Sequence, residues 1–343
     1  MVRLSGVAAA CLLWVLIGCG KPERDPQEQD PQTQVPEKPE PEQAGPPVHA
    51  VSTVEEFVEA LGSDRVIKLA PGTYTLKEPT KKKVAHVVWE KVFDGWQLTL
   101  RNVRNLTIEG VGEKPARIIC PAVYANVLSF TNAENIQLTN LVLGHSPELG
   151  FCAGGVLRFD SASNVTLERV DLFGCGINGI WATDVTGLTL SESVIRDCTN
   201  GLLVLRGCGD VKVVNTKLID SKEYDMVEIA ACPKVVFEKC SISGNIAGDE
   251  ENPKGTWADS YGDYRALFLV EGRSGVQLTN CSISKNTAGI LFKVDETSSV
   301  TASDCAISNN LASYLATTPK SVKLESTGVD DNDLRGGRFR QQK

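Results

Sequence analysis

The sequence predicts an all-β solenoid, a coil of parallel strands in which each turn of the chain is one repeat. Equivalent apolar residues recur every 22–24 residues wherever the repeat is uninterrupted, as at Val165, Leu188, Val211 and Val235. Each unit holds three short runs of alternating apolar and polar residues, separated by Gly, Asn, Asp or Ser. The first inward aliphatic residue aligns along the chain at Leu106, Ile136, Val165, Leu188, Val211, Val235, Val276, Val300 and Val322. We therefore expect about nine rungs, each with three short strands. A leucine-rich repeat of this period would need an LxxLxLxxN frame, which the units lack.

A short amphipathic helix is predicted ahead of the repeats, over residues 52–61. Ser52 or Thr53 can cap its start, Glu55 or Glu56 can complete a capping box, and Gly62 can end it. Its apolar face comprises Val54, Phe57, Val58 and Leu61. A strand, a Pro-Gly turn and a second strand follow in VIKLAPGTYTL. Because the open end of a solenoid exposes apolar surface, we expect this helix to cover it.

Equivalent residues of successive rungs should stack about 4.8 Å apart. One position within the repeat is occupied by Asn245, Asn286 and Asn310, which predicts an amide ladder. In earlier rungs the same position is occupied by Cys175 and Cys198. Two further positions within the repeat are occupied by cysteines. Cys240, Cys281 and Cys305 share one of them, and Cys208 and Cys232 share the other. We expect mostly free, buried thiols. Disulfides between stacked neighbours are the alternative, because the spacing falls within their Cα range.

The strand that closes each unit should present one flat outer face. Alternation places residues such as Leu157 and Phe159 inside and their neighbours outside. The outward residues form one column with Arg158, Trp181, Glu228 and Lys293, and a second with Asp160, Arg206, Glu271 and Asp295. Two interpretations stay open for this face. It is a ligand-binding groove, or it is a solvated sheet whose charges serve solubility.

Three insertions interrupt the repeat. The segments 146–154 and 246–264 enter the outer face, and long loops in a compact repeat are often functional. The second supplies candidate ligand contacts at Trp257, Asp259, Tyr261, Asp263 and Tyr264. A basic, aromatic insertion in the first rung holds Lys81, Lys82, Lys83, His86, Trp89 and Trp96. It would bind an acidic glycan or only cover the edge of the coil. His145, in Gly-His-Ser, is expected to be a loop residue.

The N-terminus predicts export. Residues 1–18 hold Arg3 and an apolar run too short to span a bilayer, as in a secretory signal. The residues Leu16-Ile17-Gly18-Cys19 resemble a bacterial lipobox, which implies cleavage before Cys19 and its lipidation. The alternative is an ordinary signal peptide. Residues 19–50 form a Pro-, Glu- and Gln-rich tether, residues 51–331 the solenoid, and residues 332–343 a basic tail. We expect a lipid-anchored protein of the bacterial cell envelope, most simply at the outer membrane.

The units NVTLERVDL, GVQLTNCSISKNTAGILF and NGIWATD, with the opening STVEEFVEAL, resemble right-handed parallel β-helix proteins of the pectin lyase-like superfamily. The resemblance covers residues 51 to about 331. It implies the fold, and it implies that a site would lie on the outer strand face. It does not select an activity, because the superfamily includes lyases, hydrolases, epimerases and adhesins.

The sequence lacks the motifs of the superfamily's hydrolases and epimerases. The Asp pair and Gly-His-Gly of polygalacturonase-like enzymes are missing, and so is the Asp-Pro-His of alginate epimerase-like proteins. We therefore expect a glycan- or protein-binding or structural module without a cofactor or metal. The alternative is a polysaccharide lyase or related carbohydrate-active enzyme that acts on an acidic polysaccharide. In a lyase, Arg158, Arg206 or Lys293 would serve as the base, and Ca²⁺ would neutralise the uronate carboxylate. The formal net charge of −8 argues against a nucleic-acid partner.

Overall fold

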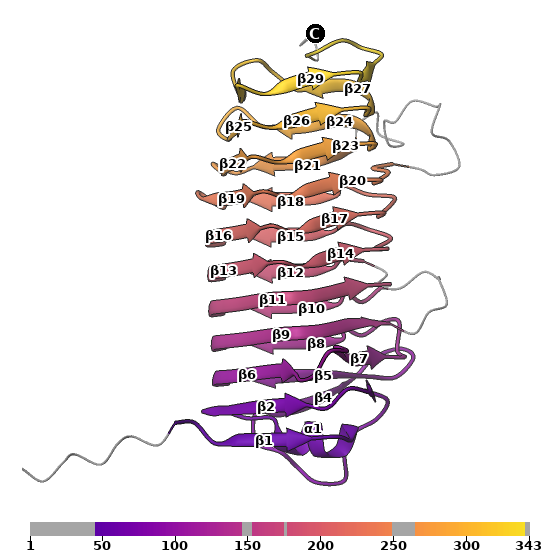
Figure 1. Cartoon of the computed structure of the whole chain (residues 1–343), viewed down its shortest axis with the longest axis vertical. Coiled ribbons are helices and arrows are strands. Elements are labelled where there is room, and N and C mark those ends of the chain that lie inside the picture. The colour runs from indigo at the N-terminus through magenta and orange to yellow at the C-terminus, as the bar shows by residue number, and fades with distance from the viewer. Residues whose placement is uncertain (1–44, 146–152, 175–176, 249–264, 340–343) are drawn as a thin grey trace, which may run out of the picture. The chain divides into compact units, whose positions relative to one another are not determined.

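In the computed structural model of this chain, the structure describes residues 45–145, 153–174, 177–248 and 265–339. Successive turns of the chain lie on one another as the rungs of a parallel β-helix (Figure 1). Each regular rung holds three short strands, as predicted. Within the described ranges, no helix is both long and apolar enough to cross a membrane.

The strands form two sheets of nineteen and eleven strands, here called sheet A and sheet B. The first ladder of sheet A holds β1 (Val48–Val51), β2 (Arg65–Leu69), β6 (Arg104–Gly110), β9 (Glu134–His145), β11 (Ser163–Phe173), β13 (Thr186–Ser191), β16 (Gly209–Val214), β19 (Val235–Glu238), β22 (Gly275–Thr279), β25 (Ser299–Ser303) and β28 (Val322–Glu325). The second ladder holds β3 (Thr73–Thr75), β7 (Ala116–Cys120), β14 (Val194–Arg196), β17 (Lys217–Ile219), β20 (Ser241–Ser243), β23 (Ser282–Ser284), β26 (Ala306–Ser308) and β29 (Gly328–Asp330). The long strands β9 and β11 belong to both ladders and join them.

Sheet B supplies the third strand of each rung. It holds β4 (Val87–Lys91), β5 (Trp96–Arg101), β8 (Leu128–Thr131), β10 (Leu157–Asp160), β12 (Ile180–Thr183), β15 (Leu203–Arg206), β18 (Val227–Ala230), β21 (Ala266–Glu271), β24 (Thr287–Val294), β27 (Leu311–Ala316) and β30 (Asp333–Leu334). All neighbours pair in parallel except β4 and β5, which form an antiparallel hairpin at the N-terminal edge.

The predicted register of the repeat is confirmed. The nine aligned aliphatic residues, from Leu106 to Val322, are consecutive Cα partners in the first ladder of sheet A. All are buried. Two strands precede them, β2 and β1, so the coil starts earlier than the alignment indicated. β1 begins at Val48, inside the segment that the sequence predicted to be tether.

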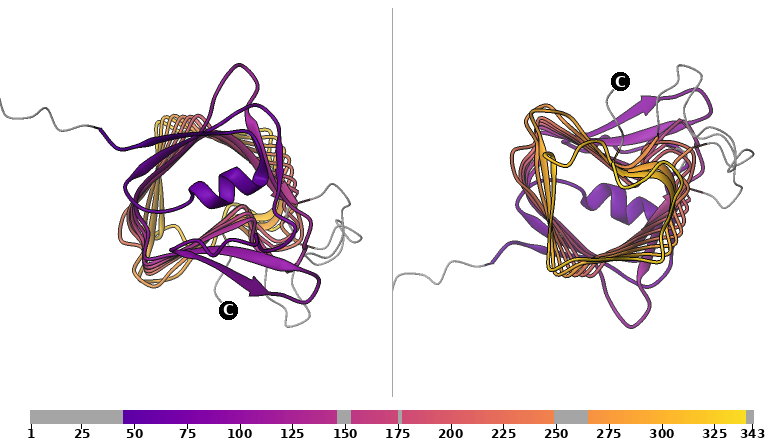
Figure 2. Two further views of the ribbon diagram at one scale, coloured as in Figure 1. Left: turned by 90° about the horizontal axis from the view of Figure 1, so that it is seen from below. Right: turned by 90° about the horizontal axis from the view of Figure 1, so that it is seen from above.

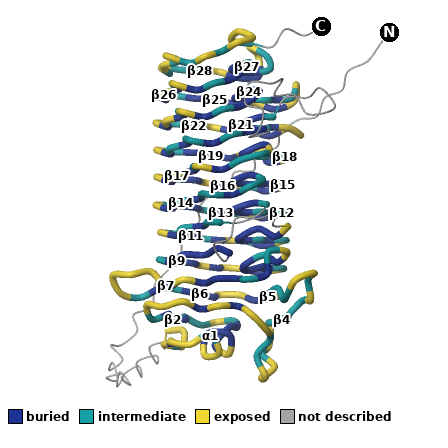
Figure 3. Tube along the Cα trace, turned by 90° about the vertical axis from the view of Figure 1, so that its right-hand side faces the viewer, coloured by how far each residue is buried: buried dark blue, intermediate teal, exposed yellow. Residues whose placement is uncertain are grey.

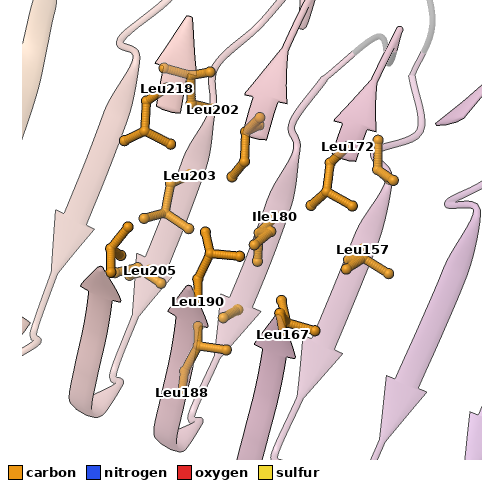
Figure 4. Packing of buried hydrophobic residues seen from close by; sticks show 14 of the residues in the cluster. Leu157, Leu167, Leu172, Ile180, Leu188, Leu190, Leu202, Leu203, Leu205 and Leu218 are labelled. Atoms are coloured by element: carbon orange, nitrogen blue, oxygen red, sulfur yellow. The ribbon is translucent and has the colours of Figure 1, made fainter. Parts of the chain in front are cut away.

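The interior is a continuous apolar core in which leucine and isoleucine side chains of successive rungs lie over one another (Figure 4). Phenylalanines add stacked pairs, such as Phe130 on Phe159 with ring centroids 5.1 Å apart. Exposed residues gather at the corners and connecting loops (Figure 3). Parallel stacking therefore buries the inward residues of each rung against the next.

The helix α1 (Val54–Ala60) lies across the N-terminal end of the coil (Figure 2). Thr53 is its N-cap, and the Thr53 and Glu56 side chains form the predicted capping box. The helix stops at Ala60, with Leu61 as C-cap. Its Phe57 is fully buried, and the ring lies edge-on to Tyr74 at 5.9 Å. α1 therefore covers apolar surface that an open end would expose.

The predicted amide ladder is confirmed and is longer than expected. Asn245 Nδ2 donates to Asn286 Oδ1 at 3.0 Å, and Asn286 Nδ2 donates to Asn310 Oδ1 at 2.9 Å. Asn310 Nδ2 then donates to Asn332 Oδ1 at 2.8 Å. Ser221 continues the ladder in the other direction, since its backbone N–H donates to Asn245 Oδ1 at 3.1 Å. The ladder satisfies buried polar groups at one corner of the coil.

The described cysteines are free and buried, as expected, at Cys120, Cys198, Cys208, Cys232, Cys240, Cys281 and Cys305. Within their ladders, backbone N–H groups donate to thiols of the next rung, as from Cys208 to Cys232 Sγ at 3.2 Å. Burial raises the pKa of the Cys120 thiol to about 11. Burial also raises the pKa of Cys305. These two thiols are therefore protonated at neutral pH.

His145 does not lie in a loop, so the sequence-based expectation was wrong. It is the last residue of β9 and is fully buried. Its Nε2 lies 2.8 Å from the carbonyl oxygen of Ala125. Burial lowers its pKa, because desolvation penalises the charged imidazolium. The long strand β9 carries the chain further than the alternation alone indicated.

Candidate functional site

The outer surface of β10, β12, β15, β18, β21 and β24 is the predicted candidate face, and we call it the sheet-B face. Its first column runs through Arg158, Trp181, Val204, Glu228, Leu269 and Lys293 as consecutive Cα partners. The four predicted members therefore share one column. Val204 and Leu269 lie between them and make the column less polar than these four residues alone indicate.

The second column runs through Asp160, Thr183, Arg206, Ala230 and Glu271. Asp295 comes directly after the last residue of β24, and its side chain contacts the turns that follow β21 and β24. Its carboxylate accepts hydrogen bonds from the backbone N–H groups of Gly272 at 2.7 Å and Thr297 at 2.9 Å. This carboxylate therefore holds a turn together.

Trp181 is the centre of a group of side-chain contacts on the sheet-B face. The guanidinium carbon of Arg158 lies 5.7 Å from the centroid of its ring, and that of Arg206 lies 5.0 Å away. The indole Nε1 donates to Thr183 Oγ1 at 3.1 Å. The parallel register brings these groups together, because Arg158 precedes Trp181 by one strand and Arg206 follows on the next. Both cations interact favourably with the indole ring.

Two carboxylates hold the two guanidinium groups. Arg158 Nε donates to Asp160 Oδ2 at 2.7 Å, and Arg206 Nη2 donates to Glu228 Oε2 at 3.0 Å. The charges of this cluster are therefore balanced. Side chains of these arginines are close to half exposed, so each ion pair stabilises the fold by about 1 kcal/mol or less. We call Arg158, Asp160, Trp181, Arg206 and Glu228 the Trp181 cluster.

The structure does not bring every predicted residue of this face together. Lys293 lies on β24, four strand steps from Trp181 on β12, which is about 19 Å. Glu271 is exposed on β21, between these two positions. The Trp181 cluster thus brings together four of the predicted charged residues, and Glu271 and Lys293 lie outside it. Trp257, Asp259, Tyr261, Asp263, Tyr264 and Cys19 lie outside the described residues.

A second polar cluster was missed by the sequence analysis. Asp225 is buried, and its carboxylate accepts from the backbone N–H of Ala266 at 2.6 Å and from Arg265 Nη1 at 3.2 Å. Burial raises the pKa of Asp225. The guanidinium of Arg265 lies 4.8 Å from the ring of Tyr224. Asp225 occupies the corner where other rungs carry Asn-Gly, which was its one sequence signal.

The first-rung insertion forms the hairpin of β4 and β5, which covers the N-terminal edge of sheet B. Its turn places Phe93 against Tyr124 at 5.1 Å between ring centroids, with Phe93 87% exposed. Asp94 anchors the turn, because its carboxylate accepts from the backbone N–H groups of Val123 and Tyr124. Lys82 pairs with Glu59 of α1 at 3.1 Å. These contacts favour the interpretation that the insertion covers the edge of the coil.

No group of three or more His, Cys, Asp or Glu side chains is placed to hold a metal ion in the part of the chain that the structure describes. The Ca²⁺ that a lyase would use therefore finds no matching set of carboxylates among these residues.

Comparison with known proteins identifies the fold. A family model described as a right-handed beta helix region matches residues 126–248. No curated protein matches the sequence. Among solved structures, the chain is similar to pectate lyase Pel9A, with 13% identity over 86% of this chain and 80% of that one and a TM-score of 0.48.

Two further structures show similar overlap. An alginate lyase from Paenibacillus sp. str. FPU-7 has 10% identity over 86% of this chain and 98% of that one, with a TM-score of 0.48. PfbA, a surface adhesin of Streptococcus pneumoniae, has 9% identity over 84% and 80%, with a TM-score of 0.40. At these identities and scores, the likenesses say nothing about substrate or activity. Right-handed β-helices carry many unrelated activities, so the fold does not select one.

Proposed function

We propose that this protein is a non-catalytic glycan-binding module of the bacterial cell envelope, which contacts its ligand through the Trp181 cluster. The observation that carries the proposal is the position of the indole between the guanidinium groups of Arg158 and Arg206. Each guanidinium has five N–H donors in a fixed plane, and one carboxylate engages only part of them. The cluster thus offers oriented donors beside an aromatic ring, which suits the hydroxyl and carboxyl groups of a sugar chain.

The same contacts argue against Arg158 and Arg206 as the base of the polysaccharide lyase alternative, which leaves Lys293 as its remaining candidate. A β-eliminating base must accept a proton, and a guanidinium paired with a carboxylate stays protonated. Arg158 and Arg206 are both paired in this way. They can therefore bind and orient a ligand but are poor proton acceptors.

Glycan binding is tested with the full-length protein in detergent, by affinity electrophoresis against a panel of uronate-containing and neutral polysaccharides. Trp181→Ala should weaken binding of the retained polysaccharide about tenfold or more, because it removes the ring that positions both arginines. Trp96→Ala is the matched control, since Trp96 is also half-buried and also lies near a cation, Lys91 at 4.8 Å. Unchanged binding by Trp181→Ala would contradict the proposal.

The same polysaccharides decide between binding and cleavage. Incubation with each uronate polymer should give no rise in absorbance from unsaturated chain ends. A rise that Arg206→Ala or Lys293→Ala abolishes would establish the lyase instead.

The envelope location is part of the proposal and rests on Cys19 in its lipobox-like context. Lipidation there would anchor the protein, since several acyl chains together hold a protein stably on a membrane. Cys19→Ser should move the protein from the membrane fraction to the soluble fraction. An unchanged fractionation, or an unmodified Cys19 peptide in mass spectrometry, would exclude the anchor.

A further inference from the structure

A groove of about 490 Å³ runs along the outside of the first ladder of sheet A. It spans β2, β6, β9 and β11 and ends at Pro46. Three asparagines form its wall, at Asn105, Asn135 and Asn164. We call this feature the amide groove.

The wall of the amide groove is a second ladder of amides. Asn164 Nδ2 donates to Asn135 Oδ1 at 2.9 Å, and Asn135 Nδ2 donates to Asn105 Oδ1 at 2.7 Å. Asn105 Nδ2 donates to the carboxylate of Asp64 at 2.6 Å. These bonds fix the planes of the amides. Each amide keeps a second N–H and a further lone pair for another partner.

The floor of the amide groove repeats with the same period. Thr107, Gln137 and Thr166 are consecutive Cα partners that point outward. Each rung therefore supplies one amide from the wall and one hydroxyl or amide from the floor. The rungs lie about 4.8 Å apart, so a pair of neutral polar side chains recurs three times along the coil axis.

The amide groove is nearly free of charge, unlike the sheet-B face. Among the described residues that line it, Arg65 alone is charged. Its guanidinium donates to the carbonyl oxygens of Ser63 at 3.0 Å and Ala60 at 3.1 Å. In the next rung, Gly187 takes the place of the wall asparagine. One rung beyond Gly187, Asp210 Oδ1 lies 2.7 Å from Lys234 Nζ. This ion pair lies past the end of the uncharged stretch.

We propose that the amide groove binds a neutral, linear polysaccharide that lies along the coil axis. Neutral amides and hydroxyls are donors and acceptors at once, as sugar hydroxyls are, and they pair with them without burying a charge. A regular polymer can repeat the same contacts in successive rungs. This site is separate from the Trp181 cluster and goes beyond the function proposed for it.

The test uses the full-length protein in detergent and isothermal titration calorimetry with cellohexaose, maltohexaose and hexagalacturonate. At least one neutral hexasaccharide should bind, and its affinity should not change between low and high salt, because no ionic contacts form. Gln137→Ala should weaken this binding about tenfold, through the loss of one or two hydrogen bonds. Asn135→Gly should do the same while keeping the left-handed backbone, as Gly187 does two rungs further on.

Matched variants separate this site from other surfaces. Gln277 is exposed and stands in the same column as Gln137, outside the amide groove, so Gln277→Ala should leave the affinity unchanged. Trp181→Ala should also leave the affinity for the neutral hexasaccharide unchanged. The same substitution should reduce binding of the polysaccharide that the Trp181 cluster retains. The proposal is overturned if neither neutral hexasaccharide binds. It is equally overturned if Gln277→Ala and Gln137→Ala cause the same loss, or if salt weakens the binding. Melting temperatures show whether each variant is folded.

Discussion

At the scale of single residues, the corners of the coil depend on a residue with positive φ followed by a buried one. Asp184 has φ of 53° and precedes buried Val185; Gly207 has φ of 64° and precedes buried Cys208. Asn, Asp and Gly tolerate this left-handed conformation best. Ala231, with φ of 55°, shows that the corner imposes it on other residues too. Such pairs of residues turn the chain and return it to the core.

His145 should make the stability of the protein depend on pH. Its folded-state pKa lies below the unfolded value of about 6.5, so the unfolded chain binds the proton more readily. The free energy of unfolding should therefore fall as pH drops through 6.5, by up to about 1.4 kcal/mol for each unit of pKa difference.

Urea denaturation at pH 7.5 and pH 5.5 measures this effect. His145→Gln should flatten the difference between the two pH values, because glutamine cannot take up the proton. His86→Gln, at an exposed histidine, should retain it. If His145→Gln keeps the full pH dependence of the wild-type protein, the assignment to His145 is wrong.

At the scale of structural elements, side-chain ladders complement the backbone ladders at the corners. One ladder changes along the coil from Cys198 to Ser221 and then to asparagine. The backbone N–H of Cys198 donates to Ser221 Oγ at 3.1 Å, and that of Asn245 donates to Asn286 Oδ1 at 3.1 Å. Thiol, hydroxyl and amide thus occupy equivalent buried positions. Asparagine satisfies the most backbone groups of the three, because its Nδ2 also donates to backbone carbonyl oxygens of neighbouring strands, as from Asn286 to Ile242 at 2.9 Å.

Asn286→Ala should lower the free energy of unfolding by about 2–4 kcal/mol, since it leaves buried donors and acceptors on two rungs unpaired. Asn286→Ser should cost less, because Ser221 fills the equivalent position in an earlier rung. Chemical denaturation measures both. Asn280→Gly, at an exposed corner residue, is the control. A loss for Asn286→Ala no larger than for Asn280→Gly would show that the ladder adds no stability.

At the scale of the described coil, stability is distributed over contacts between adjacent rungs. The register continues across the gaps in the described residues, as where Val235 of β19 pairs with Val276 of β22. Each rung therefore meets its neighbours through equivalent surfaces. In such a stack, stability is close to a sum of rung and interface contributions. The Trp181 cluster is a local departure from this repetition, whereas the amide groove follows it over three rungs.

Deletion of one complete rung should be tolerated. Thr186 and Gly209 are register partners, so removal of residues 186–208 joins Val185 to Gly209 and places β16 beside β11. The shortened protein should keep its far-UV circular dichroism per residue and unfold cooperatively at a lower urea concentration. Deletion of residues 186–196 removes half a rung and should abolish folding, because it shifts inward residues out of register. If both deletion variants fold, or neither does, the complete rung is not the unit of the fold.

The sequence by itself determined the features that depend on spacing along the chain. The rung length, the inward column from Leu106 to Val322, the amide ladder at Asn286 and the capping box of Thr53 and Glu56 follow from local periodicity and propensity. These features repeat, so each copy supports the others.

Only the tertiary structure decided which polar groups meet. The contact of Trp181 with Arg206, the pairing of Asp225 with Arg265, the burial of His145 and the shape of the amide groove depend on diagonal contacts between rungs and on side-chain direction. A repeat pattern places residues in columns, but it leaves open which way a long side chain turns within its column. The closing of ion pairs and the packing of neighbouring side chains settle that direction.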